Sequence, residues 1–170
     1  MATFSAEEYS KRIDNMLECI IDRSPEAELT AMQRLEAEMK GRIFRDGKNS
    51  RKGNIGKYRN REWIKRRKEK GRQTNKVDLA FLEEQSGGLS NAINTGTNDG
   101  HTVLGVVDGF VKRSEYQKGA KGSISQSDKV KFHEKKYGKV FQPTKEEVDI
   151  LLKSYQVRIN KIMKQCLQNP

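Results

Sequence analysis

The residues best suited to chemistry form one basic stretch between positions 59 and 72. It reads RNREWIKRRKEKGR, in which eight of fourteen residues are Lys or Arg and two are acidic. Lys and Arg side chains bind phosphate oxygens, with an affinity that falls steeply as salt rises. Tyr58 and Trp63, the only tryptophan, could stack on unpaired bases. We therefore expect a polyanion-binding or channel-facing segment, whose charges are Lys65, Arg66, Arg67, Lys68 and Arg72.

The net positive charge of the chain comes from one longer segment that includes this stretch. Residues 45–76 hold fourteen bases and three acids, a net +11 that equals the net charge of the whole chain. Three interpretations stay open: a surface for nucleic acid, a surface for an acidic protein, or a solvated loop. A basic membrane helix is less favoured, because only Trp63 and Ile64 would supply its apolar face. No helix-turn-helix, zinc module or RNA-recognition motif is visible, so any nucleic-acid binding is expected to be non-specific.

The sequence gives no positive sign of an enzyme. His101 follows a predicted turn, and His133 has only the adjacent Glu134, which does not face it on a helix. The acidic pairs lie mostly at expected helix starts, where capping and the helix dipole explain them. The glycines of the basic region lack the Lys-Ser/Thr ending of a phosphate loop. We therefore predict no catalytic residue, metal or cofactor.

The two cysteines and the hydropathy of the chain indicate the compartment in which the protein works. Cys19 and Cys166 lie in predicted helices without a CxxC pattern, and we expect them to be reduced and unpaired. No apolar run approaches the roughly 20 residues that span a bilayer. The N-terminus lacks an apolar signal core. These features predict a soluble chain, with no membrane partner, in a cytoplasm.

The elements that position the basic region are helices on either side of a small sheet. Ser5–Glu8 is a capping box, and apolar residues recur at helical spacing from Tyr9 to Ile21. Ser24-Pro25 is expected to stop that helix and start a second one, with an apolar stripe to Ile43. A second capping box, Thr144–Glu147, opens the last helix.

The middle of the chain predicts strands. A strand is expected at 77–82, and Asn98-Asp99-Gly100 predicts a hairpin turn between 92–97 and 102–107. We leave open whether 127–137 is a helix or an arm. The expected fold is α+β in one domain, with an antiparallel sheet packed by N- and C-terminal helices. Its parts are a helical region 1–44, a basic loop 45–76 with a short helix around 62–70, a sheet core 77–118, a linker or arm 119–143 and a helix 144–167.

Several short motifs occur together in one order. They are Ile43-Phe44, Gly47, Asn54-Ile-Gly-Lys-Tyr58, the basic run ending in Gly71-Arg72, Val77-Asp-Leu79, Ser86-Gly-Gly-Leu-Ser-Asn-Ala-Ile93, and Lys131-Phe-His-Glu134 before Gly138. In this order the chain resembles, over residues 40–165, the tail-completion and neck proteins of tailed bacteriophages. The chain departs from the pattern of that family at two places. It has a longer insertion before Ser86, and its basic loop holds more Lys and Arg residues.

The resemblance implies a structural virion protein. It would form a ring, commonly six-fold, at the head–tail junction or the tail end, between the connector and the tail tube or terminator, with genome DNA passing through it. The implied location is the virion neck or tail, and the host cytoplasm during assembly. Anchors of the arm and the sheet would be Ile43, Phe44, Ile55, Tyr58, Trp63, Val77, Leu79, Leu89 and Ile93. Low apolar content (34%, mean hydropathy −0.91) agrees with a chain that buries surface against neighbouring subunits. The alternative is a free nucleic-acid-binding protein that uses the same 45–76 segment.

Overall fold

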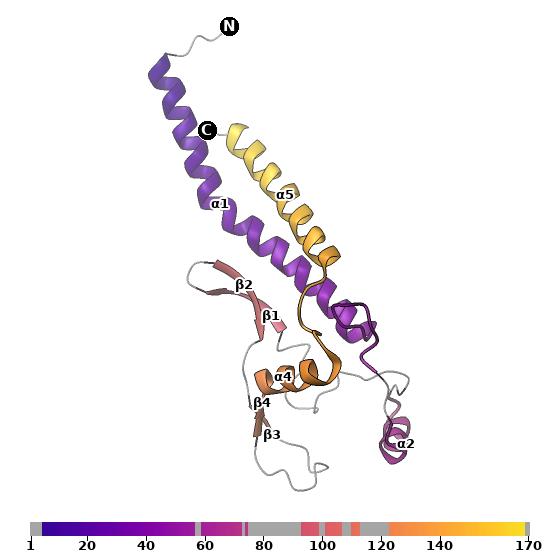
Figure 1. Cartoon of the computed structure of the whole chain (residues 1–170). Helices are drawn as coiled ribbons and strands as arrows, with labels where there is room; N and C mark the ends of the chain where they lie inside the picture. The colour runs from indigo at the N-terminus through magenta and orange to yellow at the C-terminus, as the bar shows by residue number, and fades with distance from the viewer. Residues whose placement is uncertain are drawn as a thin grey trace.

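The computed structural model describes residues 5–56, 59–72, 74, 93–98, 101–106, 110–112 and 123–168. Its elements are α1 (Ala6–Lys40), a π-helical turn η1 (Gly41–Arg45), α2 (Arg61–Glu69), β1 (Ile93–Asn98), β2 (His101–Val106), β3 (Phe110–Lys112), β4 (Ser123–Ser125), α4 (Gln126–Tyr137) and α5 (Lys145–Gln168). Figure 1 shows the long helices α1 and α5 side by side, the strands and α4 at one end of this pair, and α2 apart from both. The predicted α+β class is confirmed.

The first helix is continuous, which corrects the predicted break at Ser24-Pro25. Its capping box is as predicted: the Ser5 amide donates to Glu8 Oε2 at 2.8 Å, and hydrogen bonding to Ser5 lowers the pKa of the Glu8 carboxyl. Pro25 lies inside the helix and cannot donate to the Ile21 carbonyl. Ser24 Oγ donates to that carbonyl instead, at 3.0 Å. Figure 1 shows α1 changing direction near its middle, as a helix does at an interior proline.

Helix α5 runs antiparallel to α1 and packs along it. Ala27, Ile162 and Cys166 form a buried cluster in this seam, flanked by the half-buried Met16 and Ile20. Here the expectation of unpaired cysteines is wrong. Cys19 and Cys166 form a disulfide with a Cα–Cα distance of 5.9 Å, because the antiparallel packing brings together residues 147 positions apart. No spacing of residues within the sequence predicts this disulfide.

The other buried cluster lies where α1 meets the hairpin and the segment before α5. Leu35, Met39, Ile43, Ile55 and Val140 form it, and Leu104 of β2 packs against it. Glu36 of α1 holds the hairpin in place, because Thr95 donates to its carboxylate from both N and Oγ1, at 2.7 and 2.8 Å. Burial opposes ionisation there, but hydrogen bonds from Lys40 and Thr95 outweigh it and lower the pKa of Glu36.

The strands form two separate antiparallel pairs among the described residues. The predicted hairpin is confirmed as β1–β2, with Ile93 opposite Val106 and Asn98 opposite His101. β3 pairs with β4, so part of the 119–143 region expected to be a linker or arm is a strand. The open question at 127–137 resolves as helix α4, which ends at Gly138 with a positive φ of 78°. The strand predicted at 77–82 lies outside the described residues.

Candidate polyanion-binding arm

The arm leaves the body through a tightly hydrogen-bonded root. After η1 the chain turns at Gly47, whose φ of 64° suits glycine, and the Ile55 amide returns to the Gly47 carbonyl at 2.8 Å. Between them Asn49 accepts from the amides of Arg51 and Gly53 and donates to the Tyr137 carbonyl. Ile43 and Ile55 are each 1% exposed beneath this loop. The root is therefore fixed to the body on both sides.

Arg42 is the polar centre of the root, a role that no local pattern in the sequence indicated. Its Nε donates to Glu147 Oε1 at 2.7 Å, and its two terminal nitrogens donate to the carbonyls of Lys48, Val140 and Gln142. Glu147 also closes the predicted capping box of α5 by accepting from the Thr144 amide at 2.7 Å. One guanidinium thus joins α1's end, the arm and the start of α5.

Helix α2 forms the described tip of the arm, close to the range predicted for a short helix. The Asn60 side chain caps it by accepting from the Trp63 amide at 2.9 Å. It ends at Glu69, and the chain then turns at Gly71, whose φ is 64°, where the Arg72 amide donates to the Arg67 carbonyl at 2.8 Å. The C-terminal turn carries three bases, which the negative end of the helix dipole favours.

The predicted charges of α2 do not all face solvent. Trp63 and Ile64 are half-buried, and Arg67 is 2% exposed. These positions share one face of a helix, because residues three and four apart are neighbours. Arg67 therefore does not present its charge to solvent, which corrects its assignment as a polyanion-facing residue. Lys65, Arg66 and Lys68 are exposed, and Arg72 is half-buried.

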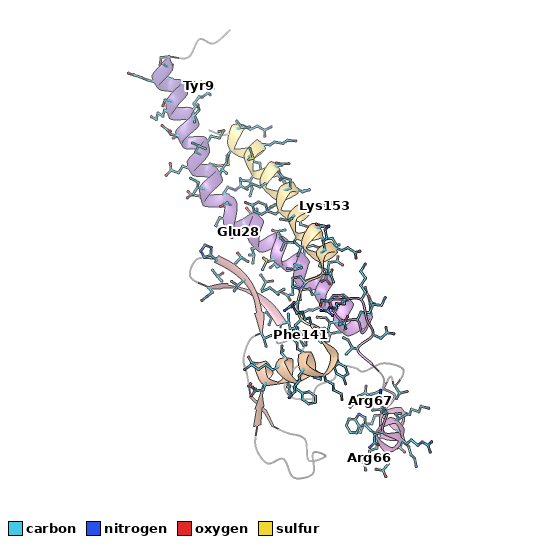
Figure 2. The ribbon with its side chains drawn as sticks, in the orientation of Figure 1. Tyr9, Glu28, Arg66, Arg67, Phe141 and Lys153 are labelled. Carbon is cyan, nitrogen blue, oxygen red and sulfur yellow. A yellow bond between two sulfur atoms is a disulfide. The ribbon has the colours of Figure 1, made fainter. Side chains whose placement is uncertain are left out.

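Figure 2 shows Arg66 and Arg67 on α2, well away from the α1–α5 pair. Residues 59–72 carry eight bases and two acids, a net charge of +6 on a single short segment. Such a density of positive charge attracts polyanions.

The predicted anchors divide into three groups. Ile43, Ile55 and Phe44 come together at the root, the first two buried and Phe44 half-buried against the same cluster. Ile93 is 4% exposed in β1, and Trp63 lies on α2 rather than in the root. Tyr58, Val77, Leu79 and Leu89 lie outside the described residues.

The described residues also bear on whether the chain has a metal site. They contain no group of three His, Cys, Asp or Glu side chains that could hold a metal ion. His133 is stacked on Tyr137, and burial, with smaller contributions from Lys136 and Lys129, lowers its pKa to about 4. Across the described ranges, none of the helices has the length and apolar character to cross a bilayer.

Comparison with known proteins adds no relative. No protein-family model, no curated protein and no solved structure matches the chain.

Proposed function

We propose that the chain is a structural subunit of a tailed-bacteriophage neck or tail, which forms a ring and extends its basic arm toward a polyanion or a neighbouring subunit. One observation carries the proposal: a strongly basic helix, α2, is held away from the body on an arm whose root is fixed. An arm with a fixed root and a distant tip is suited to contact something beyond its own domain. The order of the neck-protein motifs around this arm supports the same assignment.

The limited core supports an assembly subunit. The described residues bury only two small apolar clusters, one in the α1–α5 seam and one at the root of the arm. Twelve large apolar residues stay exposed on the described parts of the chain. A chain of this kind gains stability when neighbouring subunits cover its surface.

The charged tip supports contact with DNA in the channel of the ring. Lys65 and Lys68 are exposed on α2, where they can reach phosphate oxygens without rearrangement of the helix. Contacts to phosphates carry no sequence information, so binding would be non-specific and salt-dependent. The same surface supports the second candidate, a free nucleic-acid-binding protein.

Native mass spectrometry and electron microscopy of the purified protein test the ring. The proposal predicts a closed ring, six-fold by the resemblance, and weak DNA binding by the isolated subunit. A chain that stays monomeric or dimeric and binds duplex DNA tightly would establish the second candidate. A chain that neither forms rings nor binds DNA would overturn both.

Charge-neutral variants test the tip of the arm. The double variant Lys65→Gln/Lys68→Gln should lower the slope of log affinity against log salt by about 2 on DNA. The matched control is Lys161→Gln/Lys164→Gln, which removes two exposed charges from α5. Equal losses in both variants would show that the net charge, and not α2, binds the DNA.

A further inference from the structure

One face of α1 is covered over half of its length and uncovered over the other half. An α-helix completes five turns in 18 residues, so positions 18 apart point the same way. The covered positions Ala27, Ala31, Leu35 and Met39 are 0 to 6% exposed. The positions 18 residues before them are Tyr9, Ile13, Leu17 and Ile21, which are 37 to 68% exposed. The same apolar stripe thus continues beyond the surface that the chain itself covers.

Helix α5 adds exposed apolar residues beside this uncovered stripe of α1. Leu152, Met163 and Leu167 are exposed and lie on one face of α5, because they are 11 and 4 residues apart. In the antiparallel pair, helical geometry places both stripes along the same edge of the seam. The opposite edge carries the polar contacts, an Arg158–Glu26 ion pair and an Arg23–Gln165 hydrogen bond. We call these seven residues, Tyr9, Ile13, Leu17, Ile21, Leu152, Met163 and Leu167, the α1–α5 apolar face.

The charges beside this face are of opposite sign on the two helices. Without Arg23 and Glu26 of the opposite edge, residues 6–30 hold six acids and two bases, a net charge of −4. Without Arg158 of that edge, residues 153–168 of α5 hold three bases and no acid. Figure 2 places Glu28 and Lys153 on opposite outer sides of the pair. The surface is therefore apolar in the middle, acidic along one margin and basic along the other.

We propose that a second copy of this chain covers the α1–α5 apolar face. A two-fold axis parallel to the helices places α1 of each copy on α5 of the other, so that each acidic margin meets a basic margin. The result is a four-helix bundle in which every neighbouring pair is antiparallel. A second copy fits because this surface is complementary to itself in charge as well as apolar in its centre.

The disulfide holds the two helices of this face in position before a second copy binds. Cys19–Cys166 holds the end of α5 against α1 beside Leu17 and Leu167, so the two stripes are already aligned in the single chain. A surface that is ordered before association loses less conformational entropy when it binds. The inference does not depend on the proposed ring, whose contact involves the arm.

Sedimentation of the full chain tests the proposal. The wild-type protein should self-associate, and Leu17→Lys/Ile21→Lys should weaken that association by about 100-fold or more, because each copy would bring two charges into the apolar centre. Both residues are exposed in the single chain, so circular dichroism should show an unchanged helix content. Val157→Lys is the control for an added charge: Val157 is 72% exposed and is not one of the seven residues of the face, so a lysine beside the basic margin should leave association at least as strong as in the wild type.

Three sedimentation results would overturn the inference. They are a wild-type chain that stays monomeric at about 100 μM, a Leu17→Lys/Ile21→Lys variant that associates as strongly as the wild type, and a Val157→Lys variant that dissociates as much as the Leu17→Lys/Ile21→Lys variant. Association should also survive Lys65→Gln/Lys68→Gln, which separates this contact from the function of the arm. A lysine variant that stays monomeric while another virion protein binds the wild-type face in place of a second copy would also contradict it.

Discussion

Arg42 Nε lies 2.7 Å from Glu147 Oε1, and the two side chains are only 10% and 7% exposed. This ion pair joins residues 105 positions apart, at the point where α1 ends, the arm begins and α5 starts. The remaining guanidinium donors are satisfied by three carbonyls, as a buried charge requires. Arg42 therefore helps to fix the root of the arm to the body.

Replacement of Arg42 should strongly destabilise the fold. Arg42→Met leaves the Glu147 carboxylate buried without its partner and frees three carbonyls, at an expected cost of about 3–5 kcal/mol. Chemical denaturation measures the loss. The control is Lys52→Met, which removes a pair with Glu146 whose side chains are 60% and 69% exposed, and should cost at most about 1 kcal/mol. Similar costs for the two variants would show that Arg42 contributes no more than a surface pair.

The sequence predicted the features whose signals are local. Both capping boxes and the hairpin depend on residues that lie within a few positions of each other, and the structure has them where expected. The Arg42–Glu147 pair and the disulfide join residues more than 100 positions apart, and no local pattern encodes such contacts. On α2 the spacing predicted a helix but not its rotation, so the burial of Arg67 was missed.

Removal of the disulfide should destabilise the α1–α5 pair. Cys19→Ser/Cys166→Ser opens a link across 147 residues, and we expect a loss of about 2–5 kcal/mol in the free energy of unfolding. Hydrogen exchange should locate the change in the last turns of α5. Dithiothreitol should reproduce the loss in the wild type and have no effect on the double variant. A wild type indifferent to reductant would contradict this prediction.

Pro25 in the interior of α1 should lower the stability of the folded chain, and its replacement by alanine should raise that stability. Pro25→Ala supplies the missing amide to the Ile21 carbonyl and straightens the helix, which should raise stability by about 1–3 kcal/mol. Ser24→Ala removes the hydroxyl that now bonds this carbonyl, and should lower stability by about 1 kcal/mol in the wild type. In the Pro25→Ala background the serine should matter much less. Thermal unfolding of the four proteins forms a double-mutant cycle, and strict additivity would show that Ser24 does not compensate for Pro25.

The pH dependence of stability should report on His133. Its Nδ1 is buried and has no hydrogen-bond partner among the described residues, and its pKa falls from 6.5 to about 4 in the folded chain. The unfolded chain therefore binds this proton first as the solution is acidified. The contribution of the neutral His133 side chain to the free energy of unfolding is complete above pH 6.5. It declines as the pH falls towards 4 and is lost below pH 4.

The free energy of unfolding should fall by on the order of 3 kcal/mol through His133, if α4 unfolds together with the rest of the chain. Denaturant titrations between pH 7 and pH 4 measure it. His133→Phe keeps a ring against Tyr137 but cannot be protonated, so its stability should change much less over this range. His101→Gln, at an exposed position of the hairpin, should behave like the wild type. Glu8 and Glu36, whose pKa values are lowered, lose their contributions only below about pH 4.5 in every variant, and they cancel in the comparison. Parallel pH profiles for the wild type and His133→Phe would show that the imidazole is not held neutral by the fold.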